Sequence, residues 1–359
     1  MKILHFIYGL TLGGAESFIR SCMKALNADC IEWHFAIQNP SVTNQFFKDN
    51  VTPGNIHILP SFTKNPLGQF RALSKLIKTN QFDIVHIHAN ALINPIPIIC
   101  CMHLKQRFII HSHNTATNRG AVCHAVHGVN KVWLQHCANV KRLACSEIAG
   151  RWMFGYKKFI VANNAIDVRN FIFNENGRTQ VRSLYGITDD AYVMGTVGRM
   201  VEAKNYPFII ALFREYLKID QSARLLLVGD GPLRGMLEKQ TSDISQFVVF
   251  VGSQQNTVPF YSAMDCFIAP SFFEGLPIVT VEAQASGLNI IVSNAIPDEV
   301  NVSGLVNKLS LADPMEKWLS LLKQPKASNY ERVIRGTNLL SCQFDLPYLA
   351  KTLRNVYIE

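Results

Sequence analysis

Short runs of apolar residues alternate along the chain with segments of helical periodicity. Between the runs, apolar residues recur at helical spacing, as they do from Ala15 to Leu26. Strands separated by helix-length segments form βα units, so the pattern predicts parallel sheets. The expected strands are Ile3–Tyr8, Ile84–His88, Phe108–His111, Arg142–Cys145, Phe159–Ala162, Tyr192–Val197, Arg224–Val228, Val248–Val251, Cys266–Ala269 and Asn289–Val292.

The pattern occurs twice, and a length of 359 residues suits two domains of about 150 residues each. A polar stretch, 163–182, places the boundary near Ile166. We therefore expect an N-terminal Rossmann-like domain over 1–165, a C-terminal Rossmann-like domain over 166–340, and a C-terminal helix segment over 341–359, helical from Leu346 to Tyr357, that packs near the hinge. Doubly wound sheets bind ligands at the carboxyl ends of their strands, so two facing domains hold a ligand in the cleft between them.

Charged residues are unevenly distributed along the chain. The whole sequence has 35 Lys and Arg against 26 Asp and Glu, a net charge of +9 that suits an anionic partner. Residues 1–165 hold 17 basic and 6 acidic residues, whereas residues 166–359 hold 18 and 20, and all eleven histidines lie at or before His136. Apolar residues make up 48 % and charged residues 17 %, which excludes a disordered or collagen-like chain.

The nine cysteines include no Cys-x-x-Cys pair, which favours reduced thiols over a disulfide framework or a zinc site. No apolar run reaches the roughly 18 residues of a membrane span. The N-terminal MKILHFIYGL has the apolar character of a signal peptide, but it contains His5 and no cleavage pattern follows, so a first strand is favoured. We expect a cytoplasmic protein that is peripheral at the inner face of the cytoplasmic membrane.

Two segments that follow buried strands carry charged groups that could bind a ligand. Arg199 and Lys204 follow the strand 192–197, and two cations at a strand end suit a diphosphate, although their spacing alone fits a solvated basic loop equally well. Glu274 and Glu282 lie among apolar residues, which argues against solvent-facing acids. Carboxylates accept paired hydrogen bonds from neighbouring hydroxyls, so the two acids could bind a sugar and a ribose.

The segment that contains these two acids has conflicting local signals. Pro277 marks a helix start and Gly287 a helix stop, yet Ile278–Val281 has strand propensity. Such a conflict is typical of a place where function overrides foldability.

Glycine turns and paired histidines are weaker signals. Gly13 and Gly14 precede a helix, whose first N–H groups attract phosphate, but a tight turn needs glycine in any case. A second glycine turn, 229–234, is most simply a βα turn.

His86 and His88 are two residues apart, as are His111 and His113, so each pair shares one face of a strand. Zinc is conceivable, but no acidic or cysteine ligand lies at metal spacing, so we expect no metal and instead hydrogen bonds to substrate or backbone.

In this order and at these intervals the motifs resemble those of the family 4 retaining glycosyltransferases, which have the GT-B fold, over residues 1–325. The combination of His-Ser-His-Asn-Thr with Ile-Pro-Asp-Glu-Val at 296–300 resembles the branch that builds bacterial exopolysaccharide, capsule or O-antigen. One departure is Asn289, where the family has proline. The motifs are Gly13-Gly14-Ala15-Glu16, His111-Ser112-His113-Asn114, Ala144-Cys145-Ser146-Glu147, Asn163-Asn164-Ala165-Ile166-Asp167, Gly198-Arg199 with Lys204, Gly229-Asp230-Gly231-Pro232, and Glu274 with Glu282.

The resemblance implies transfer of a hexosyl or N-acetylhexosaminyl group from a nucleotide-diphosphate sugar, with UDP as the favoured nucleotide, retention of anomeric configuration, and neither cofactor nor metal. The implied acceptor is a lipid-linked saccharide. The resemblance further implies a role for each site residue. Arg199, Lys204 and Gly14 would bind the donor diphosphate, and Glu274, Gly275 and Leu276 the donor sugar. Glu282, Gly252 and Ser253 would bind the ribose and base. Gly13, Gly14 and His113 would lie on the acceptor side, and His113 and Glu274 would be catalytic.

The residues themselves favour the same chemistry, because two fixed cations can stabilise a departing diphosphate. No residue stands out as a covalent nucleophile, which favours front-face attack with the departing phosphate oxygen as base. A non-catalytic sugar-nucleotide scaffold and a sugar-nucleotide epimerase are the alternatives. Nucleic-acid binding is disfavoured because no basic helix is evident.

The basic first half suits anionic lipid. The cluster of interest is Lys105, Arg107, Arg119, Lys131, Lys141, Arg142 and Arg151.

Overall fold

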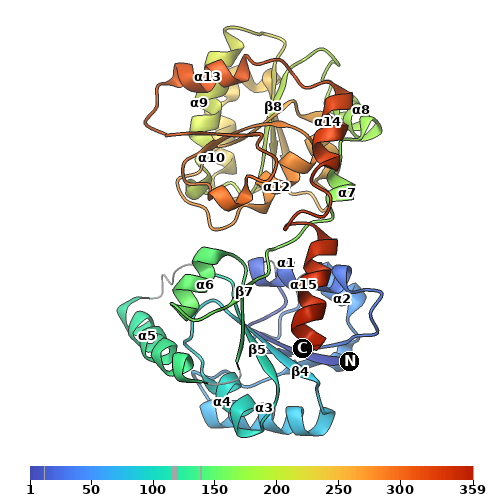
Figure 1. Ribbon diagram of the computed structural model, residues 1–359. Coiled ribbons are helices and arrows are strands. Elements are labelled where there is room, and N and C mark those ends of the chain that lie inside the picture. The colour runs from blue at the N-terminus through green and yellow to red at the C-terminus, as the bar shows by residue number, and fades with distance from the viewer. Residues whose placement is uncertain (12, 115–119, 138–139, 359) are drawn as a thin grey trace. The chain divides into compact units, whose positions relative to one another are not determined.

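The computed structural model describes residues 1–11, 13–114, 120–137 and 140–358, which form two compact units. The first unit contains Met1–Ala165 and Leu346–Glu359, and the second contains Ile166–Asp345. Figure 1 shows each unit as a sheet with helices on both faces. The nine cysteines, all of them within the described residues, form no disulfide bond. Within the described residues, no helix combines the length and the apolar character that crossing a membrane requires.

The first unit contains a parallel seven-stranded sheet in the order β3-β2-β1-β4-β5-β6-β7. Its strands are β1 (Lys2–Ile7), β2 (Glu32–Ile37), β3 (Ile56–Ile58), β4 (Ile84–Ala89), β5 (Phe108–Ser112), β6 (Lys141–Ala144) and β7 (Ile160–Val161). Its helices are α1 (Gly14–Ala25), α2 (Gln45–Asn50), the 3-10 turn η1 (Pro53–Asn55), α3 (Pro66–Asn80), α4 (Ile96–His103), α5 (Gly120–His136), α6 (Glu147–Phe154) and α15 (Leu346–Ile358).

Side-chain alternation along the central strands of this sheet builds two cores. In β1, Leu4 and Phe6 face the layer formed by α3, α4, α5 and α6. Ile3 faces the opposite layer, where Phe18 of α1 packs beside Leu353 of α15. The C-terminal helix is therefore part of the first unit, and Figure 1 shows α15 in red beside this sheet.

The second unit contains a parallel six-stranded sheet in the order β10-β9-β8-β11-β12-β13. Its strands are β8 (Val193–Val197), β9 (Arg224–Val228), β10 (Val248–Gly252), β11 (Cys266–Ala269), β12 (Asn289–Ser293) and β13 (Val306–Leu309). Its helical segments are α7 (Val168–Phe171), α8 (Glu175–Leu184), η2 (Glu202–Lys204), α9 (Tyr206–Leu217), α10 (Arg234–Gln240), η3 (Ser242–Phe247), α11 (Val258–Ala263), α12 (Ile278–Ala285), η4 (Asp298–Val300), α13 (Met315–Leu322) and α14 (Asn329–Thr337).

Buried arginines hold the helices of the second unit together. Arg182 of α8 donates to Asp265 at 2.8 Å, and Arg332 of α14 donates to the carbonyl oxygen of Met264 at 2.8 Å. Both guanidinium groups lie beside the chain segment that leads from α11 into β11. These cations satisfy helix-end carbonyl groups and are structural.

The structure corrects several sequence expectations. Three strands, β2, β3 and β13, were not predicted, and most predicted strands differ from the observed ones by a residue at one or both ends. The polar stretch 163–182, which was predicted to separate the two domains and not to form helices, contains α7 and most of α8. By contrast, the helix predicted between Pro277 and Gly287 is confirmed as α12, although its first residues, 278–281, have strand propensity. Gly287, which follows the helix, has a positive φ of 68°. The C-terminal helix, predicted over 346–357, is confirmed as α15 and extends one residue further, to Ile358.

Candidate active site

An ion pair joins two loops at the carboxyl ends of β8 and β11. The ammonium group of Lys204 lies 2.5 Å from Oε1 of Glu274, and the hydroxyl of Ser271 donates to the same oxygen at 2.7 Å. The amide of Phe272 donates to the carbonyl oxygen of Ala203 at 2.8 Å, which fixes the loops to each other. The structure thus brings a cation and a carboxylate together at the edge of the sheet where parallel α/β folds bind ligands.

Local backbone geometry places Lys204 at this edge. The 3-10 turn η2 ends at Lys204, and Asn205 adopts a left-handed conformation with a φ of 53° before α9 begins. Asparagine is among the few residues that tolerate this region. Tyr206 follows, and its hydroxyl donates to the carbonyl oxygen of Gly198 at 2.8 Å, which closes the loop onto its own start.

Three glycines pack against one another at the ends of β8, β9 and β10. The amide of Gly229 donates to the carbonyl oxygen of Gly252 at 2.9 Å. A Cβ atom on Gly229 would clash with the carbonyl oxygen of Gly198, and the φ of Gly229 is 134°. Close backbone approach and a positive φ both require glycine here. The turn 229–234, which was interpreted as a plain βα turn, is therefore packed tightly against the loop that begins at Gly198.

Glu282 lies in α12, and the hydroxyl of Tyr261 from α11 donates to its Oε2 at 2.6 Å. Burial raises the pKa of Tyr261, so the phenol stays protonated and acts as the donor. Tyr261 was not predicted as part of the site, because it stands in no recognisable motif and its contact depends on the fold. Ser271 lies in the same loop as Glu274, but no role was predicted for it.

Other predicted residues of this unit lie at the same end of the sheet without joining the ion pair. Arg199 is exposed, and its side chain has no polar partner among the described residues. Ser253 and Gly275 are exposed, while Leu276 packs against the core of the unit. Arg199, Ser253 and Gly275 are therefore accessible to a ligand.

In the first unit, Gly13 is the N-cap of α1 and Gly14 is its first residue. Glu16 accepts a hydrogen bond from the hydroxyl of Thr11 at 3.1 Å, and its carboxylate lies against Gly13, where a Cβ atom would meet it. Glycine at this position therefore makes room for the acidic side chain as well as for the turn.

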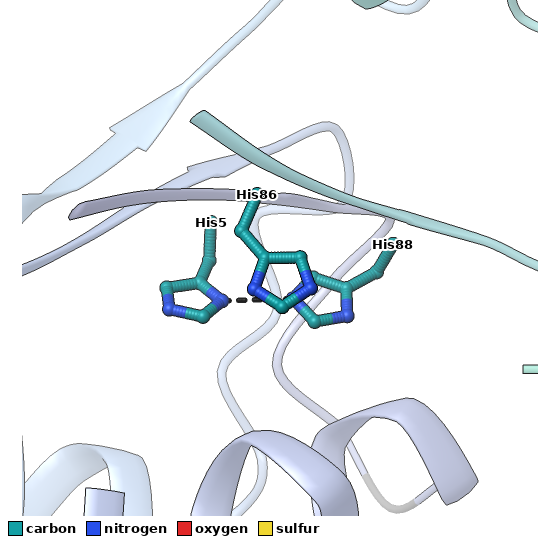
Figure 2. Close-up of side chains that lie close together, drawn as sticks. All are labelled: His5, His86 and His88. Atoms are coloured by element: carbon teal, nitrogen blue, oxygen red, sulfur yellow. Dashed lines mark hydrogen bonds between the residues drawn. The ribbon is translucent and has the colours of Figure 1, made fainter. Parts of the chain in front are cut away.

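Five histidines form a buried layer on the face of the sheet that carries α1 and α15. The parallel register aligns His5 with His86 and His88 with His111, and His113 follows directly after β5. Figure 2 shows His5, His86 and His88 side by side on neighbouring strands. The two pairs, His86 with His88 and His111 with His113, were predicted from the sequence, but the fifth member, His5 on β1, was not.

Hydrogen bonds connect these rings. Nδ1 of His88 lies 2.8 Å from Nε2 of His113, and Nε2 of His88 lies 2.8 Å from Nδ1 of His5. Burial lowers the pKa of His113 and that of His5 to about 3, and that of His88 well below its ordinary value. At neutral pH these rings are uncharged, so His113 can donate or accept a hydrogen bond but does not act as a cation.

Comparison with known proteins identifies the class. A solved structure of HepE (Alr3699) from Anabaena in complex with UDP-glucose matches with a TM-score of 0.74, at 16 % identity and 99 % coverage of both chains, which shows a GT-B fold. The sequence model of the family described as "Glycosyl transferases group 1" matches residues 191–323. The chain belongs to this family, the family 4 glycosyltransferases.

Relatives in bacteria extend the match to the whole chain. The putative glycosyltransferase EpsF of Bacillus subtilis is 28 % identical over 99 % of this chain and 96 % of its own length. The capsular polysaccharide biosynthesis glycosyltransferase CapH of Staphylococcus aureus is 22 % identical over 100 % and 99 %. The UDP-Gal:alpha-D-GlcNAc-diphosphoundecaprenol alpha-1,3-galactosyltransferase of Escherichia coli is 27 % identical over 62 % of this chain and 60 % of its own length.

Proposed function

We propose that this glycosyltransferase moves a hexosyl or N-acetylhexosaminyl group from a UDP-sugar to a lipid-linked saccharide, with retention of anomeric configuration, in the synthesis of a bacterial surface polysaccharide. The Lys204–Glu274 pair at the carboxyl edge of the second sheet carries the proposal, because it sets a cation and a sugar-binding carboxylate side by side. The E. coli relative, named for a UDP-sugar donor and a diphosphoundecaprenol acceptor, and the capsular relative support the choice of substrates and pathway.

In this proposal Lys204, Arg199 and the amide of Gly14 bind the donor diphosphate. A lysine beside the phosphates stabilises the charge that grows on the departing diphosphate, so the protein itself supplies the cations for this step. A phosphate oxygen of the leaving group takes the proton of the acceptor hydroxyl as the new glycosidic bond forms on the same face.

The sugar and the nucleoside are assigned to separate carboxylates. Glu274, with the backbone of Gly275 and Leu276, accepts hydrogen bonds from sugar hydroxyls, and Ser271 holds its carboxylate in place. Glu282, held by Tyr261, accepts from the ribose hydroxyls.

The remaining assignments complete the proposed site. Gly252 and Ser253 adjoin the base, and a base at this position would lie against backbone, which suits a glycine turn. On the acceptor side, His113 contacts the sugar near the reacting centre, and Gly13 with Gly14 leaves space for the incoming hydroxyl.

The test combines a panel of UDP- and GDP-sugars with a lipid-linked saccharide and measures release of the nucleoside diphosphate. We expect release only with a UDP-sugar and acceptor together, insensitivity to chelators, and an anomeric configuration in the product that matches the donor by NMR. Lys204→Met should abolish release, whereas Lys218→Met, on the exposed side of the same unit, should not. Conversion of the donor without acceptor would indicate an epimerase instead, and binding without turnover a scaffold.

The acceptor implies a membrane surface, and the structure changes which residues of the first unit we assign to it. Several cations of the predicted basic cluster are used inside the fold. Arg107 and Lys141 donate to the carbonyl oxygen of Val356 at 3.3 and 3.0 Å, at the end of α15. Lys131 donates to the carbonyl oxygen of Trp152 at 2.6 Å, at the end of α6. Cations at helix C-termini are stabilising, so these groups have a structural role.

The other members of the cluster divide in the same way. Arg142 donates to the carbonyl oxygen of Leu134 at 3.2 Å, near the end of α5, and Arg151 is paired with Glu147. Lys105 is exposed, and Arg119 lies outside the described residues.

Helix α5 offers a better contact surface for lipid. Four of its valines are exposed, by 77, 36, 71 and 57 % for Val122, Val126, Val129 and Val132. No acidic residue occurs between Asp83 and Glu147, so nothing on this part of the chain repels an anionic headgroup. Figure 1 shows α5 at the periphery of the first unit, beside α6. An exposed apolar helix face without acids suits the interface of an anionic bilayer.

Co-sedimentation with vesicles tests this assignment. We expect binding to anionic vesicles that weakens at high salt, because surface charges are screened over about 8–10 Å. Val129→Glu should reduce the bound fraction, whereas Val333→Glu, an exposed valine of the second unit, should not. Equal binding of the two variants would remove α5 from the contact surface.

A further inference from the structure

The histidine layer of the first unit contains two separate hydrogen-bonded chains. One runs from His5 through His88 to His113, with 2.8 Å between the paired nitrogens at each step. The other runs from the hydroxyl of Tyr357 on α15 to Nδ1 of His86 at 2.9 Å, and from Nε2 of His86 towards Nδ1 of His111 at 3.3 Å. The first chain ends at the residue that the proposed function places at the reaction centre.

Nitrogen atoms of two histidine triads lie close enough together to suggest a metal site, namely His5 with His86 and His88, and His88 with His111 and His113. In the second triad, His88 and His113 are already hydrogen-bonded to each other. In the first triad, ring orientation argues against a metal. The rings of His86 and His88 stack with centroids 4.3 Å apart and planes 19° apart, so their in-plane lone pairs run alongside each other instead of converging. Figure 2 shows this stacking, and it shows that His88 is already hydrogen-bonded to His5. The contacts favour a chain of hydrogen bonds.

Neutral rings in such a chain have linked proton positions. Burial lowers the pKa of all three members, so each ring holds one proton at neutral pH. A neutral imidazole that is hydrogen-bonded through both nitrogens donates at one and accepts at the other. Only two arrangements therefore satisfy His88, and each of them fixes which nitrogen of His5 and which nitrogen of His113 carries a proton.

The two arrangements differ at the ends of the chain. Among the described residues, Nε2 of His5 and Nδ1 of His113 have no hydrogen-bond partner. In one arrangement the outer N–H belongs to His5, which is fully buried beside Trp33 and Phe35 of β2 and has no acceptor among the described residues. In the other, the outer N–H belongs to Nδ1 of His113. Buried N–H groups without an acceptor are rare and costly. Nδ1 of His113 is also buried in the ligand-free structure, but the residue as a whole is only partly buried and lies at the carboxyl end of β5, where parallel sheets bind ligands. Of the two ends of the chain, His113 is therefore the one that a ligand can supply with an acceptor.

We propose that His88, held by His5, is a positioning residue that orients the ring of His113 and fixes its proton on Nδ1, so that this N–H donates to an oxygen atom of the bound substrate. The proposal rests on the assignment of His113 to the reaction centre. His5 supplies the first N–H of the chain, from Nδ1 to Nε2 of His88, and His88 passes the same polarity on, from its Nδ1 to Nε2 of His113. No proton is transferred during the reaction, since the chain acts by holding one tautomer.

Histidine ¹⁵N NMR reads the tautomer directly, because protonated and unprotonated ring nitrogens have different shifts. In the ligand-free wild-type protein we expect His113 to be protonated at Nδ1. In His88→Leu we expect the signal to move towards the Nε2–H form. Tyr357→Phe is the matched control, since it removes one hydroxyl from the other chain and should leave His113 unchanged. If His88→Leu does not fold, His5→Leu tests the same point, because it removes the donor that polarises His88.

Transfer kinetics give the second readout. Loss of one oriented hydrogen bond to the reacting substrate should lower kcat by roughly tenfold in His88→Leu, with a smaller change in KM, while Tyr357→Phe stays near wild type. His88→Asn keeps an N–H donor near the position of Nδ1 and should recover part of the loss. A merely structural role would lower activity only in step with the folded fraction and would not be rescued in this way.

Two results would overturn the proposal. One is a wild-type His113 protonated at Nε2, and the other is an Nδ1–H tautomer that persists in both His88→Leu and His5→Leu. The underlying assignment fails separately. If the tautomer follows the prediction but His113→Ala transfers sugar at the wild-type rate, then His113 is not at the reaction centre, and the substrate contact proposed here is refuted while the hydrogen-bonded chain stands.

Discussion

Replacing Glu274 by glutamine should separate binding of the nucleotide from transfer of the sugar. In the ligand-free protein the carboxylate holds Lys204, with the side chains 10 and 26 % exposed, respectively. Glutamine retains the size of the side chain and can still accept a hydrogen bond from Ser271, but it releases the lysine from its ion pair. The freed ammonium group is then available to a diphosphate.

The size of the effect follows from the geometry. A charge-assisted hydrogen bond contributes about 1.5–3 kcal/mol, and the partial exposure of Lys204 reduces this to about 1–2 kcal/mol. Free UDP should therefore bind Glu274→Gln as tightly as wild type or up to roughly tenfold more tightly. The second unit should lose about the same 1–2 kcal/mol of stability, which corresponds to a fall of several degrees in melting temperature. Sugar transfer should fall by about a hundredfold or more, because Glu274 is the proposed sugar ligand.

Titration calorimetry measures the affinity of each variant for UDP and for a UDP-sugar, and release of the nucleoside diphosphate measures transfer. Glu215→Gln, which removes an exposed carboxylate beside Lys218, is the matched control and should change neither binding nor transfer. Lys204→Met should weaken binding of UDP by tenfold or more. If Glu274→Gln lost as much affinity for free UDP as Lys204→Met, the carboxylate would be a nucleotide ligand and the reasoning would be refuted.

Three further predictions follow from contacts in the two units. His113→Ala should abolish transfer with only a small fall in melting temperature in a thermal scan, and a large loss of stability with activity following the folded fraction would instead indicate a structural histidine. Tyr261→Phe should weaken binding of UDP and of a UDP-sugar equally, by roughly tenfold in calorimetry, because it removes the hydrogen bond that holds Glu282, and unequal losses would contradict a ribose ligand. Gly229→Ala should destabilise the second unit by at least about 1–3 kcal/mol in chemical unfolding, whereas Gly235→Ala, where nothing lies within 4 Å of the added carbon, should not, and equal stability of both would contradict the crowding inferred at β8 and β9.

The elements that were predictable from sequence are those whose signal is local. β9 and β11 are continuous apolar runs because both faces of the sheet are covered, and they were predicted to the residue. β13, with the sequence Val-Asn-Lys-Leu, is a half-buried edge strand and has no such run. The residues 278–281 adopt a helix because packing on the sheet and the flanking Pro277 and Gly287 outweigh the propensity of β-branched residues.

The candidate site was predictable only as far as its motifs reach. Lys204 and Glu274 stand in recognisable loops, and parallel-sheet topology brings the loops together. Tyr261, which holds Glu282, and His5, which contacts His88, are distant in sequence from these partners and carry no local signal.

The charge of the first half was likewise predictable only as a total, and not as the position of each basic side chain. The count of basic residues suggested a lipid-binding cluster, yet Arg107, Lys131 and Lys141 point at the ends of helices. A composition cannot distinguish a cation that caps a helix from one that faces solvent.

The chain enters the second unit at Ile166 and leaves it at Asp345, and these two residues lie side by side as a parallel backbone bridge. The second unit is thus an uninterrupted segment of sequence, whereas the first is completed by α15, whose Leu353 and Val356 fill its core. During synthesis the second unit is fully translated before the last helix of the first has emerged. The apolar residues of the N-terminal sheet that α15 covers therefore stay exposed while the 180 residues of the second unit are translated and fold. Chaperone dependence and misfolding of this enzyme should accordingly concentrate in the half that is translated first.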